Sequence, residues 1–164
     1  MLKTERLILR EPRAEDLDAM FAAYSDPQAM RYWSTPPHET PDVTQTLLDG
    51  RIAHWAKAQV NFQIELDGHY IGNAGNYARN EVGFMLQRQF WRQSILTEAM
   101  EAIVPYLWEV TDHDHLFADA DPLNAASCGL LTSLGFHETH RAERTFCING
   151  LWSDSVYFRL NRPT

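Results

Sequence analysis

The sequence lacks the features of several classes of protein. Its 164 residues contain only two cysteines, Cys128 and Cys147, which are too few for a disulfide framework and do not form a metal-type pair. Lysine and arginine number 14 against 22 aspartates and glutamates, and the resulting net charge of −8 argues against nucleic acid as the main partner. The same charge mildly favours a cationic substrate.

Long hydrophobic runs are absent as well. No apolar stretch approaches the roughly 20 residues that span a membrane, so we expect no membrane partner. The N-terminus, MLKTERLILREPR, lacks the apolar core of a signal peptide, and we therefore expect a cytoplasmic protein. His113, Asp114 and His115 have no third ligand in view, so we interpret them as a polar turn and expect no metal.

What is present is the composition of a globular protein. Hydrophobic residues make up 45% of the chain and charged residues 22%. Neither an internal repeat nor a long linker divides the chain, and the proline-rich segment 34–42 is typical of an ordered loop. We therefore expect one domain over residues 1–164, long enough to bury a proper core.

Hydrophobic periodicity predicts the elements of this domain. Leu7 and Leu9 alternate as in a strand, whereas Leu17, Met20 and Tyr24 recur at the spacing of one helix face. The predicted strands are residues 6–10, 60–66, 70–77, 81–87, 115–121, 137–148 and 151–160. One helix is predicted after Pro12, and three more are predicted at residues 40–57, 97–110 and 124–134. Hairpins near both ends and a β-α-β-α middle predict an α+β fold, with a mixed sheet of about seven strands and helices on both faces.

One connection has the position of an anion site. The stretch QRQFWRQSILTEAM at 87–100 joins a predicted central strand to a helix. Open α/β sheets bind ligands at this end of their strands, and free N–H groups at such a turn bind phosphate. These turns normally contain glycine, yet this stretch has none. The loop alone therefore leaves two interpretations, a phosphate site without its glycines or a simple connector.

Four segments follow one another along the chain. They are TERLILR at 4–10, EVGFMLQRQFWRQSILTEAM at 81–100, NAASCGLLTSLGF at 124–136 and the Asn149-Gly150 hairpin. With these segments in this order, the sequence resembles the GNAT N-acetyltransferase superfamily, most closely its RimJ/RimL branch, known for acetylating the N-termini of ribosomal proteins. The resemblance implies a GNAT-like acyl-CoA N-acyltransferase fold, acetyl-CoA as co-substrate and an amine as acceptor.

The resemblance also implies which residues bind acetyl-CoA. The backbone of the central strand would pair with pantetheine at Met85, Leu86 and Gln87. The N–H groups of the loop would bind pyrophosphate at Arg92, Gln93, Ser94, Ile95, Leu96 and Thr97. Asn124 and Ser127 match the positions that face pantetheine and the thioester sulfur, and Ser127 matches the proposed general acid of the RimL-like branch.

This sequence departs from the family pattern in the loop. The branch usually reads Trp-Gly-Lys-Gly-Tyr-Ala where this chain has Trp91 to Leu96, so Ser94 and Leu96 replace two small residues. Ser94 either caps the following helix or donates to phosphate. Leu96 either crowds the pyrophosphate or turns into the core, whereas Arg92 adds a charge that helps to hold phosphate.

The catalytic positions depart as well. Many GNAT enzymes have a tyrosine where this chain has Leu131, so Ser127 either stabilises the leaving thiolate or only packs in its helix. Phe146 replaces the glutamate of the RimL-like pattern. Glu81 and Glu143 are then the candidate bases, although each is equally explained as a solvated acid.

The acceptor side is less specific. Tyr32 and Trp33 lie in the region that shapes this side in the family, and they either contact the acceptor or pack in the core or at the surface. The sequence thus predicts an N-acetyltransferase in which a protein N-terminus or a small-molecule amine attacks acetyl-CoA directly.

The alternative to this enzyme is a catalytically decayed GNAT-fold module that binds or regulates, with weakened or no acetyl-CoA binding. The joint loss of the loop glycines and of the glutamate suggests it. The unpaired edges of the sheet also allow a homodimer without requiring one.

Overall fold

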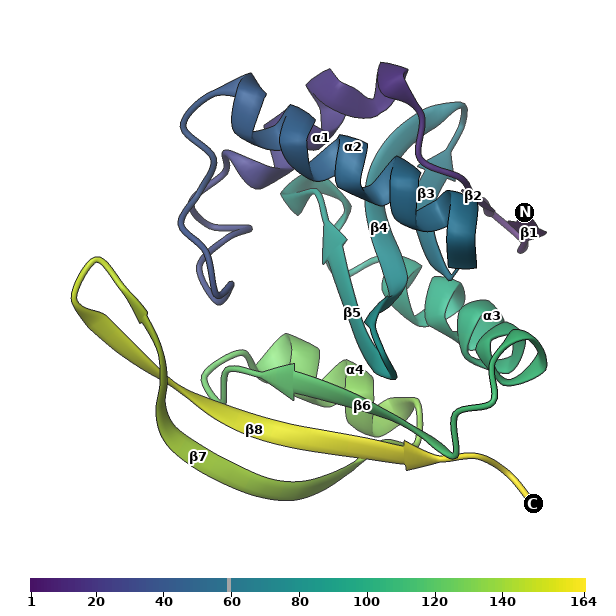
Figure 1. Cartoon of the computed structure of the whole chain (residues 1–164), viewed down its shortest axis with the longest axis vertical. Helices are drawn as coiled ribbons and strands as arrows, with labels where there is room; N and C mark the ends of the chain where they lie inside the picture. The colour runs from purple at the N-terminus through teal and green to yellow at the C-terminus, as the bar shows by residue number, and fades with distance from the viewer. Residues whose placement is uncertain (59) are drawn as a thin grey trace.

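The computed structural model describes residues 1–58 and 60–164 and contains one eight-stranded sheet in the order β1-β2-β3-β4-β5-β6-β8-β7 (Figure 1). The strands are β1 (Leu2–Lys3), β2 (Leu7–Arg10), β3 (Asn61–Leu66), β4 (His69–Ala78), β5 (Glu81–Leu86), β6 (His115–Ala120), β7 (His137–Ile148) and β8 (Leu151–Asn161). The helices are α1 (Leu17–Tyr24), α2 (Pro41–Ala58), α3 (Ile95–Val110) and α4 (Ala125–Ser133), with 3-10 turns at Ala14–Asp16 and Arg88–Phe90.

The predicted mixed sheet and element order are confirmed, with one additional strand. This strand, β1, pairs antiparallel with β2 through Leu2 and Leu9. It has two residues, which is too short for a pattern of alternation to be recognised in the sequence. Among the described residues, no helix combines the length and the apolar character that crossing a membrane requires.

Helices cover both faces of the sheet, as predicted (Figure 1). Neighbouring residues of the central strands point to opposite faces and join different buried clusters. Ile71 and Leu86 pack with residues of α3 and α4, whereas Tyr70 and Met85 pack with residues of α1 and α2. The sheet is therefore buried from both sides at its centre.

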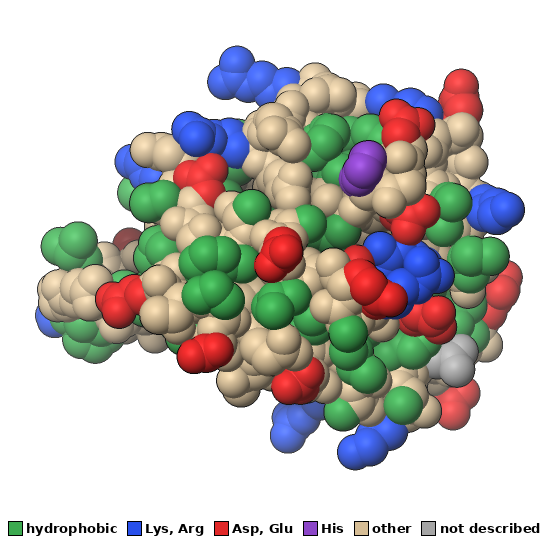
Figure 2. Space-filling view, turned by 90° about the horizontal axis from the view of Figure 1, so that it is seen from above, with side chains coloured by type: hydrophobic (Ala, Val, Ile, Leu, Met, Phe, Trp, Pro, Cys, Tyr) green, Lys and Arg blue, Asp and Glu red, His purple; other side chains and the backbone are tan. Residues whose placement is uncertain are grey.

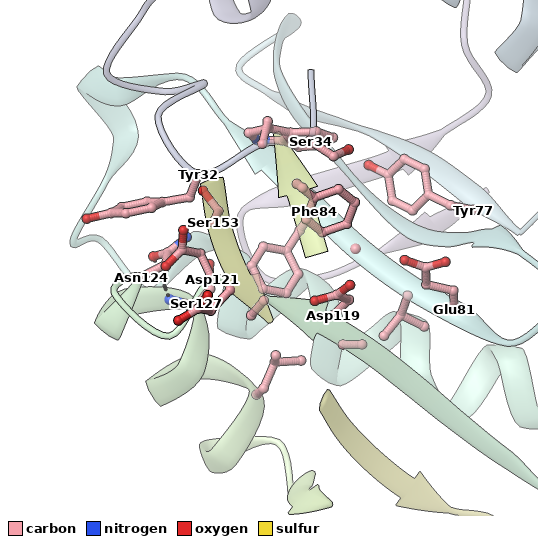
Figure 3. Close-up of a pocket in the computed structure, with 18 of the residues that line it drawn as sticks. Tyr32, Ser34, Tyr77, Glu81, Phe84, Asp119, Asp121, Asn124, Ser127 and Ser153 are labelled. Carbon is pink, nitrogen blue, oxygen red and sulfur yellow. Dashed lines mark hydrogen bonds between the residues drawn. The ribbon is translucent and has the colours of Figure 1, made fainter. Parts of the chain in front are cut away.

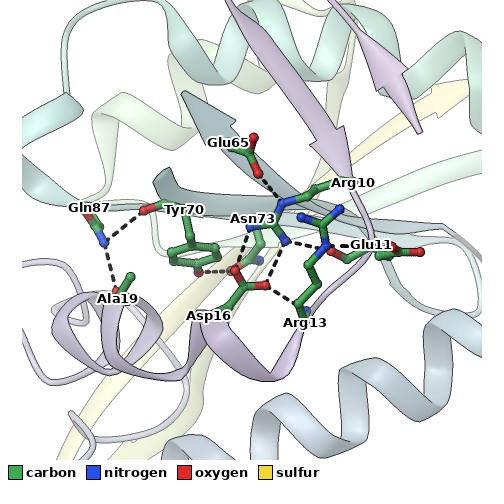
Figure 4. A network of polar contacts seen from close by, with 9 residues as sticks. All are labelled: Arg10, Glu11, Arg13, Asp16, Ala19, Glu65, Tyr70, Asn73 and Gln87. Carbon is green, nitrogen blue, oxygen red and sulfur yellow. Dashed lines mark hydrogen bonds and ion pairs between the residues drawn. The ribbon is translucent and has the colours of Figure 1, made fainter. Parts of the chain in front are cut away.

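A buried ion network fixes the start of α1 to the sheet (Figure 4). Arg10, only 5% exposed, donates two hydrogen bonds to Asp16 at 2.9 and 2.7 Å and a third to Glu65 at 2.5 Å. Asp16 also accepts a hydrogen bond from the amide of Arg13 at 2.8 Å. Because one guanidinium binds both carboxylates, the buried charges of Arg10 and Asp16 are hydrogen-bonded and not isolated.

Charges on the surface are distributed differently. Figure 2 shows acidic and basic side chains interspersed among hydrophobic ones over the face seen from above. No block of a single sign is visible on this face.

The feature of the fold that positions the site is the divergence of β5 and β6. These strands are parallel and pair only through Glu81 and Phe117. Hydrogen bonds at this closed end run from the amide of Phe117 to the carbonyl of Asn80 at 3.0 Å and from Asn80 Nδ2 to the carbonyl of His115 at 3.1 Å. Beyond this point the two strands separate, and the facing edge of β5 has no strand partner.

The direction of the free backbone groups follows from the pairing with β4. The amide of Gln87 donates to the carbonyl of Ile71 at 2.9 Å, so Gln87 faces β4. Backbone groups alternate between the two edges of a strand, and Phe84 and Leu86 therefore face the opening beside β6. The backbones of Met85 and Gln87, predicted to pair with pantetheine, face β4 instead. Trp91 Nε1 donates to the carbonyl of Leu86 at 2.9 Å, which leaves the Leu86 amide and both groups of Phe84 at the open edge.

Candidate active site

Two cavities meet where β5 and β6 diverge. The first, here called the acidic cavity, has a volume of about 260 Å³, and the second, here called the loop groove, has a volume of about 650 Å³. Six residues line both: Ala29, Tyr32, Trp33, Phe84, Asn124 and Ser127. We call this shared wall the junction. A group held at the junction is accessible from both cavities.

The two cavities carry opposite charge. Four carboxylates line the acidic cavity, namely those of Glu81, Asp119, Asp121 and Asp154, and no lysine, arginine or histidine does so among the described residues. The described lining of the loop groove includes Arg31 and Arg92 and no aspartate or glutamate. The groove therefore favours an anionic ligand, and the acidic cavity favours a cationic one.

The glycine-free loop adopts the backbone conformation that glycine would favour. Arg92 has φ of 59° and Ser94 has φ of 57°, both in the left-handed region. These are the two positions at which the family pattern has glycine, so the conformation is kept without the residue that adopts it most easily. The sequence drew attention to Ser94 and Leu96, but the strained pair is Arg92 and Ser94.

A local and a long-range hydrogen bond hold this loop. Gln93 Nε2 donates to the carbonyl of Gln89 at 3.1 Å, and the carbonyl of Gln93 accepts from Arg6 at 3.0 Å. Arg6 also pairs with Glu98 at 2.7 Å, in the first turn of α3. The connection between β1 and β2 thus anchors both the loop and the helix that follows it.

The start of α3 offers backbone N–H groups to the groove. Ser94 is the N-cap residue, but its side chain makes no capping hydrogen bond, so its hydroxyl is not used as a cap. Helix geometry leaves the amides of Ile95, Leu96 and Thr97 without intrahelical acceptors. The Leu96 side chain packs against the core while one part of it lines the groove. Free amides and a helix N-terminus favour an anion here.

Ser127 lies at the junction, in the first turn of α4. Its amide donates to Asn124 Oδ1 at 3.2 Å, which makes Asn124 the N-cap of this helix. No hydrogen bond of the Ser127 hydroxyl is found among the described residues. The hydroxyl is therefore available to a ligand. Leu131, which stands where many GNAT enzymes have tyrosine, is buried behind it in the wall of the acidic cavity.

The candidate bases separate in the structure. Glu81 lines the acidic cavity at the closed end of the β5–β6 pair (Figure 3). Glu143 is exposed on β7 and is not part of the described lining of either cavity. Phe146 lines the acidic cavity, so an aromatic ring stands where the family pattern has a glutamate.

The sequence reasoning missed three acids of this cavity. Asp119 and Asp121 alternate with apolar residues along and just beyond β6, and Asp154 belongs to β8. Acidic residues at the carboxyl end of a parallel strand are a signal that could have identified the first two. Burial raises the pKa of Asp119, and the charge of Asp121 raises it further.

The expected acceptor-side aromatics lie at the junction. Tyr32 and Trp33 follow α1 and line both cavities. Trp33 packs edge-on against Tyr24, with ring centroids 5.7 Å apart, and the Arg31 guanidinium lies 5.2 Å from the centroid of the Tyr32 ring. These contacts fix the two rings beside Phe84.

Metal ligands do not gather in the described part of the chain. No group of three histidine, cysteine, aspartate or glutamate residues there has the arrangement of a metal site. His115 Nδ1 instead contacts Asp114 Oδ1 at 2.6 Å.

Comparison with known proteins agrees with this architecture. The sequence profile of the acetyltransferase (GNAT) domain matches residues 6–137. The uncharacterized N-acetyltransferase p20 of Bacillus licheniformis is 27% identical over 147 residues, covering 84% of this chain and 82% of that protein.

Solved structures share the fold at low sequence identity. A GNAT-family acetyltransferase from Bacillus anthracis gives a TM-score of 0.85 at 20% identity, covering 98% of this chain and 97% of that chain. The structure of RimL, a ribosomal L7/L12 alpha-N-protein acetyltransferase in complex with coenzyme A, gives a TM-score of 0.84 at 15% identity, covering 96% of this chain and 95% of that chain.

Because the profile spans most of the chain, the protein belongs to the GNAT acetyltransferase family. The family membership and the enzyme class that the sequence predicted, an acetyltransferase, are both confirmed. RimL, from the branch that the sequence most resembles, is among its structural neighbours.

The first prediction concerns the left-handed loop residues. Ser94→Gly and Arg92→Gly are each expected to raise the free energy of unfolding by about 0.5–1 kcal/mol, because a residue with a Cβ atom is disfavoured at positive φ. Urea unfolding measures the change. Gln93→Gly is the matched control, since φ of Gln93 is not positive. This control should lower stability, and equal effects at all three positions would contradict the strain argument.

The second prediction concerns Glu81, whose pKa is raised by burial and by the charge of Asp119. The folded state then binds more protons than the unfolded state, so stability falls as pH rises from the ordinary value of 4.5 through the raised one. Glu81→Gln should therefore raise the melting temperature by a few degrees at neutral pH and not below about pH 4.

Thermal melts at both pH values test this prediction. Glu101→Gln, at an exposed position of α3, is the matched control and should change neither melting temperature. A gain of equal size at acidic and neutral pH would show that packing, and not ionisation of Glu81, is responsible.

Proposed function

We propose that this protein transfers the acetyl group of acetyl-CoA to a primary amine by direct attack, with both substrates bound together. The observation that carries this proposal is the junction between two cavities of opposite charge. The loop groove, with its arginines, suits the phosphates of CoA, and the acidic cavity suits a cationic amine.

The residues of the loop groove fit acetyl-CoA. The first-turn amides of α3 and the guanidinium of Arg92 would hold the phosphates, since both favour anions. The open edge of β5 at Phe84 and Leu86 would pair with the amide groups of pantetheine, as an added strand would. The structure of RimL in complex with coenzyme A, on the same fold, supports this use of the groove.

Chemistry would take place at the junction. The bound ammonium first releases one proton to solvent, and the resulting neutral amine attacks the thioester carbonyl, so that a C–N bond forms and the C–S bond breaks. An open-edge amide of β5 polarises the carbonyl oxygen, and the Ser127 hydroxyl donates a hydrogen bond to the departing sulfur. The attacking nitrogen loses its proton to a carboxylate of the acidic cavity.

Asp121 is the carboxylate best placed for that proton. Its backbone carbonyl accepts a hydrogen bond from the amide of Asn124 at 2.9 Å, which ties it to the junction, and its Oδ1 accepts from the amide of Leu123 at 2.8 Å, which leaves Oδ2 for the proton. Figure 3 shows its side chain beside Asn124 and Ser127. Glu81 and Asp121 both line the acidic cavity and not the loop groove, but Glu81 lies at the closed end of the β5–β6 pair.

The third prediction tests binding of acetyl-CoA. Calorimetric titration of the wild type should give saturable binding, and Arg92→Ala should weaken it by roughly 5- to 20-fold, because a charge-assisted contact to phosphate is lost. Arg88→Ala is the matched control, because Arg88 lies in the same loop but pairs with Asp26 at 3.0 Å and lines neither cavity. Failure of the wild type to bind would instead favour the decayed module.

The fourth prediction tests catalysis. Ser127→Ala should lower kcat by roughly 10- to 100-fold while the KM for acetyl-CoA changes little, because the hydroxyl acts on the leaving sulfur. Release of CoA with a panel of amines gives both constants. An unchanged kcat would remove Ser127 from the mechanism and leave it a packing residue of α4.

A further inference from the structure

The carboxylates of the acidic cavity occupy two separate places along it. Asp121 lies beside the junction, because it is bonded to Asn124. All three carboxylates, those of Glu81, Asp119 and Asp121, line the acidic cavity and not the loop groove, and Glu81 lies at the closed end of the β5–β6 pair. Figure 3 shows the side chains of Glu81 and Asp119 on the side of the cavity away from Ser127. The cavity therefore has a reaction end and a far end, and both ends are acidic.

Strand geometry gives the separation of the two ends. Asp119 and Asp121 are two residues apart on one side of the β6 chain, which corresponds to about 7 Å. Phe84, at the junction, is three residues beyond Glu81 on β5, or about 10 Å along the strand. A small molecule that reaches from one end to the other thus needs a short linear chain.

The far-end carboxylates, those of Glu81 and Asp119, form no ion pair among the described residues. Both are partly buried, and burial raises the pKa of each; the charge of Asp119 further raises the pKa of Glu81, and the charge of Asp121 further raises that of Asp119. The Ser155 hydroxyl and His140 offset part of the rise in the pKa of Asp119. Elsewhere the fold pairs such groups, as Arg10 pairs with Asp16 and Glu65. A bound cation would remove this imbalance.

The walls between the two ends suit an aliphatic cation. Tyr77 and Phe84 line the cavity along β4 and β5, and Tyr32 and Trp33 line it from the connection after α1. Aromatic faces attract ammonium groups and also pack against methylene chains.

The geometry points to an acceptor with two cationic groups, a compact linear diamine, whose reacting amine lies at the junction and whose second ammonium is held by Glu81 and Asp119. This inference rests on the proposed function and adds the substrate class. It makes Glu81 a substrate-binding residue and not the base. Singly charged amines and peptide N-termini lack a second ammonium in the required place.

Kinetics with matched amines test the inference. The probes are diaminobutane, diaminopentane, butylamine and a neutral-sequence peptide with a free N-terminus, each with acetyl-CoA and with CoA release as the readout. In the wild type, kcat/KM for the diamines should exceed that for butylamine by roughly 10- to 100-fold, as expected for one charge-assisted contact. Glu81→Gln and Asp119→Asn should each reduce this ratio, and the double variant should reduce it to about one.

The outcomes separate the two proposals. If butylamine or the peptide is acetylated as well as the diamines, or if the ratio survives in the double variant, the inference is overturned and the proposed function stands. If no amine releases CoA although acetyl-CoA binds, both are overturned. Glu101→Gln should keep the wild-type ratio, and thermal melts show that each variant is folded.

Discussion

One backbone constraint determines the site, namely that the parallel strands β5 and β6 pair only through Glu81 and Phe117. Sheet strands normally satisfy both edges, but here β4 satisfies one edge of β5 and the other opens beyond the single pair. The same divergence leaves the backbone of Phe84 unpaired and makes room for two cavities that share a wall. Unpaired edge groups and the space beside them thus have a common origin.

Local charge matters more at this site than the net charge of −8. Arginines reach the loop groove from the glycine-free loop and from the connection after α1, while the acids of the other cavity come from β5, from β8 and from the end of β6. These elements are far apart in sequence, and only the fold sorts them by sign. In the proposed reaction, CoA would be attracted to the loop groove and the amine to the acidic cavity, on opposite sides of the junction. Charge would then disfavour either ligand in the cavity of the other.

The sequence predicted most of the architecture because periodicity and turn residues are local signals. Every predicted strand and helix is found, and Ser127, Asn124, Tyr32 and Trp33 lie together at the junction. Long-range properties could not be read in this way. Glu143 and Glu81 are alike as isolated acids, and only the sheet places one at the surface and the other in a cavity. Likewise, the alternation that put Leu7 and Leu9 on one side of β2 gave no sign that Arg10, on the other side, would be buried between two acids.

The glycine-free loop shows why a family pattern and a backbone conformation are different constraints. Left-handed φ at Arg92 and Ser94 disfavours folding by about 1 kcal/mol per residue relative to glycine, yet the loop is held by Arg6, Glu98 and the bond from Trp91 to Leu86. Contacts outside the loop can therefore impose a conformation that its own residues disfavour. In return, the side chain at position 92 is a guanidinium lining the groove, which glycine cannot provide. Loss of glycine from such a turn is thus compatible with an anion site, provided that the surrounding contacts fix the backbone and the replacing residue carries the right charge.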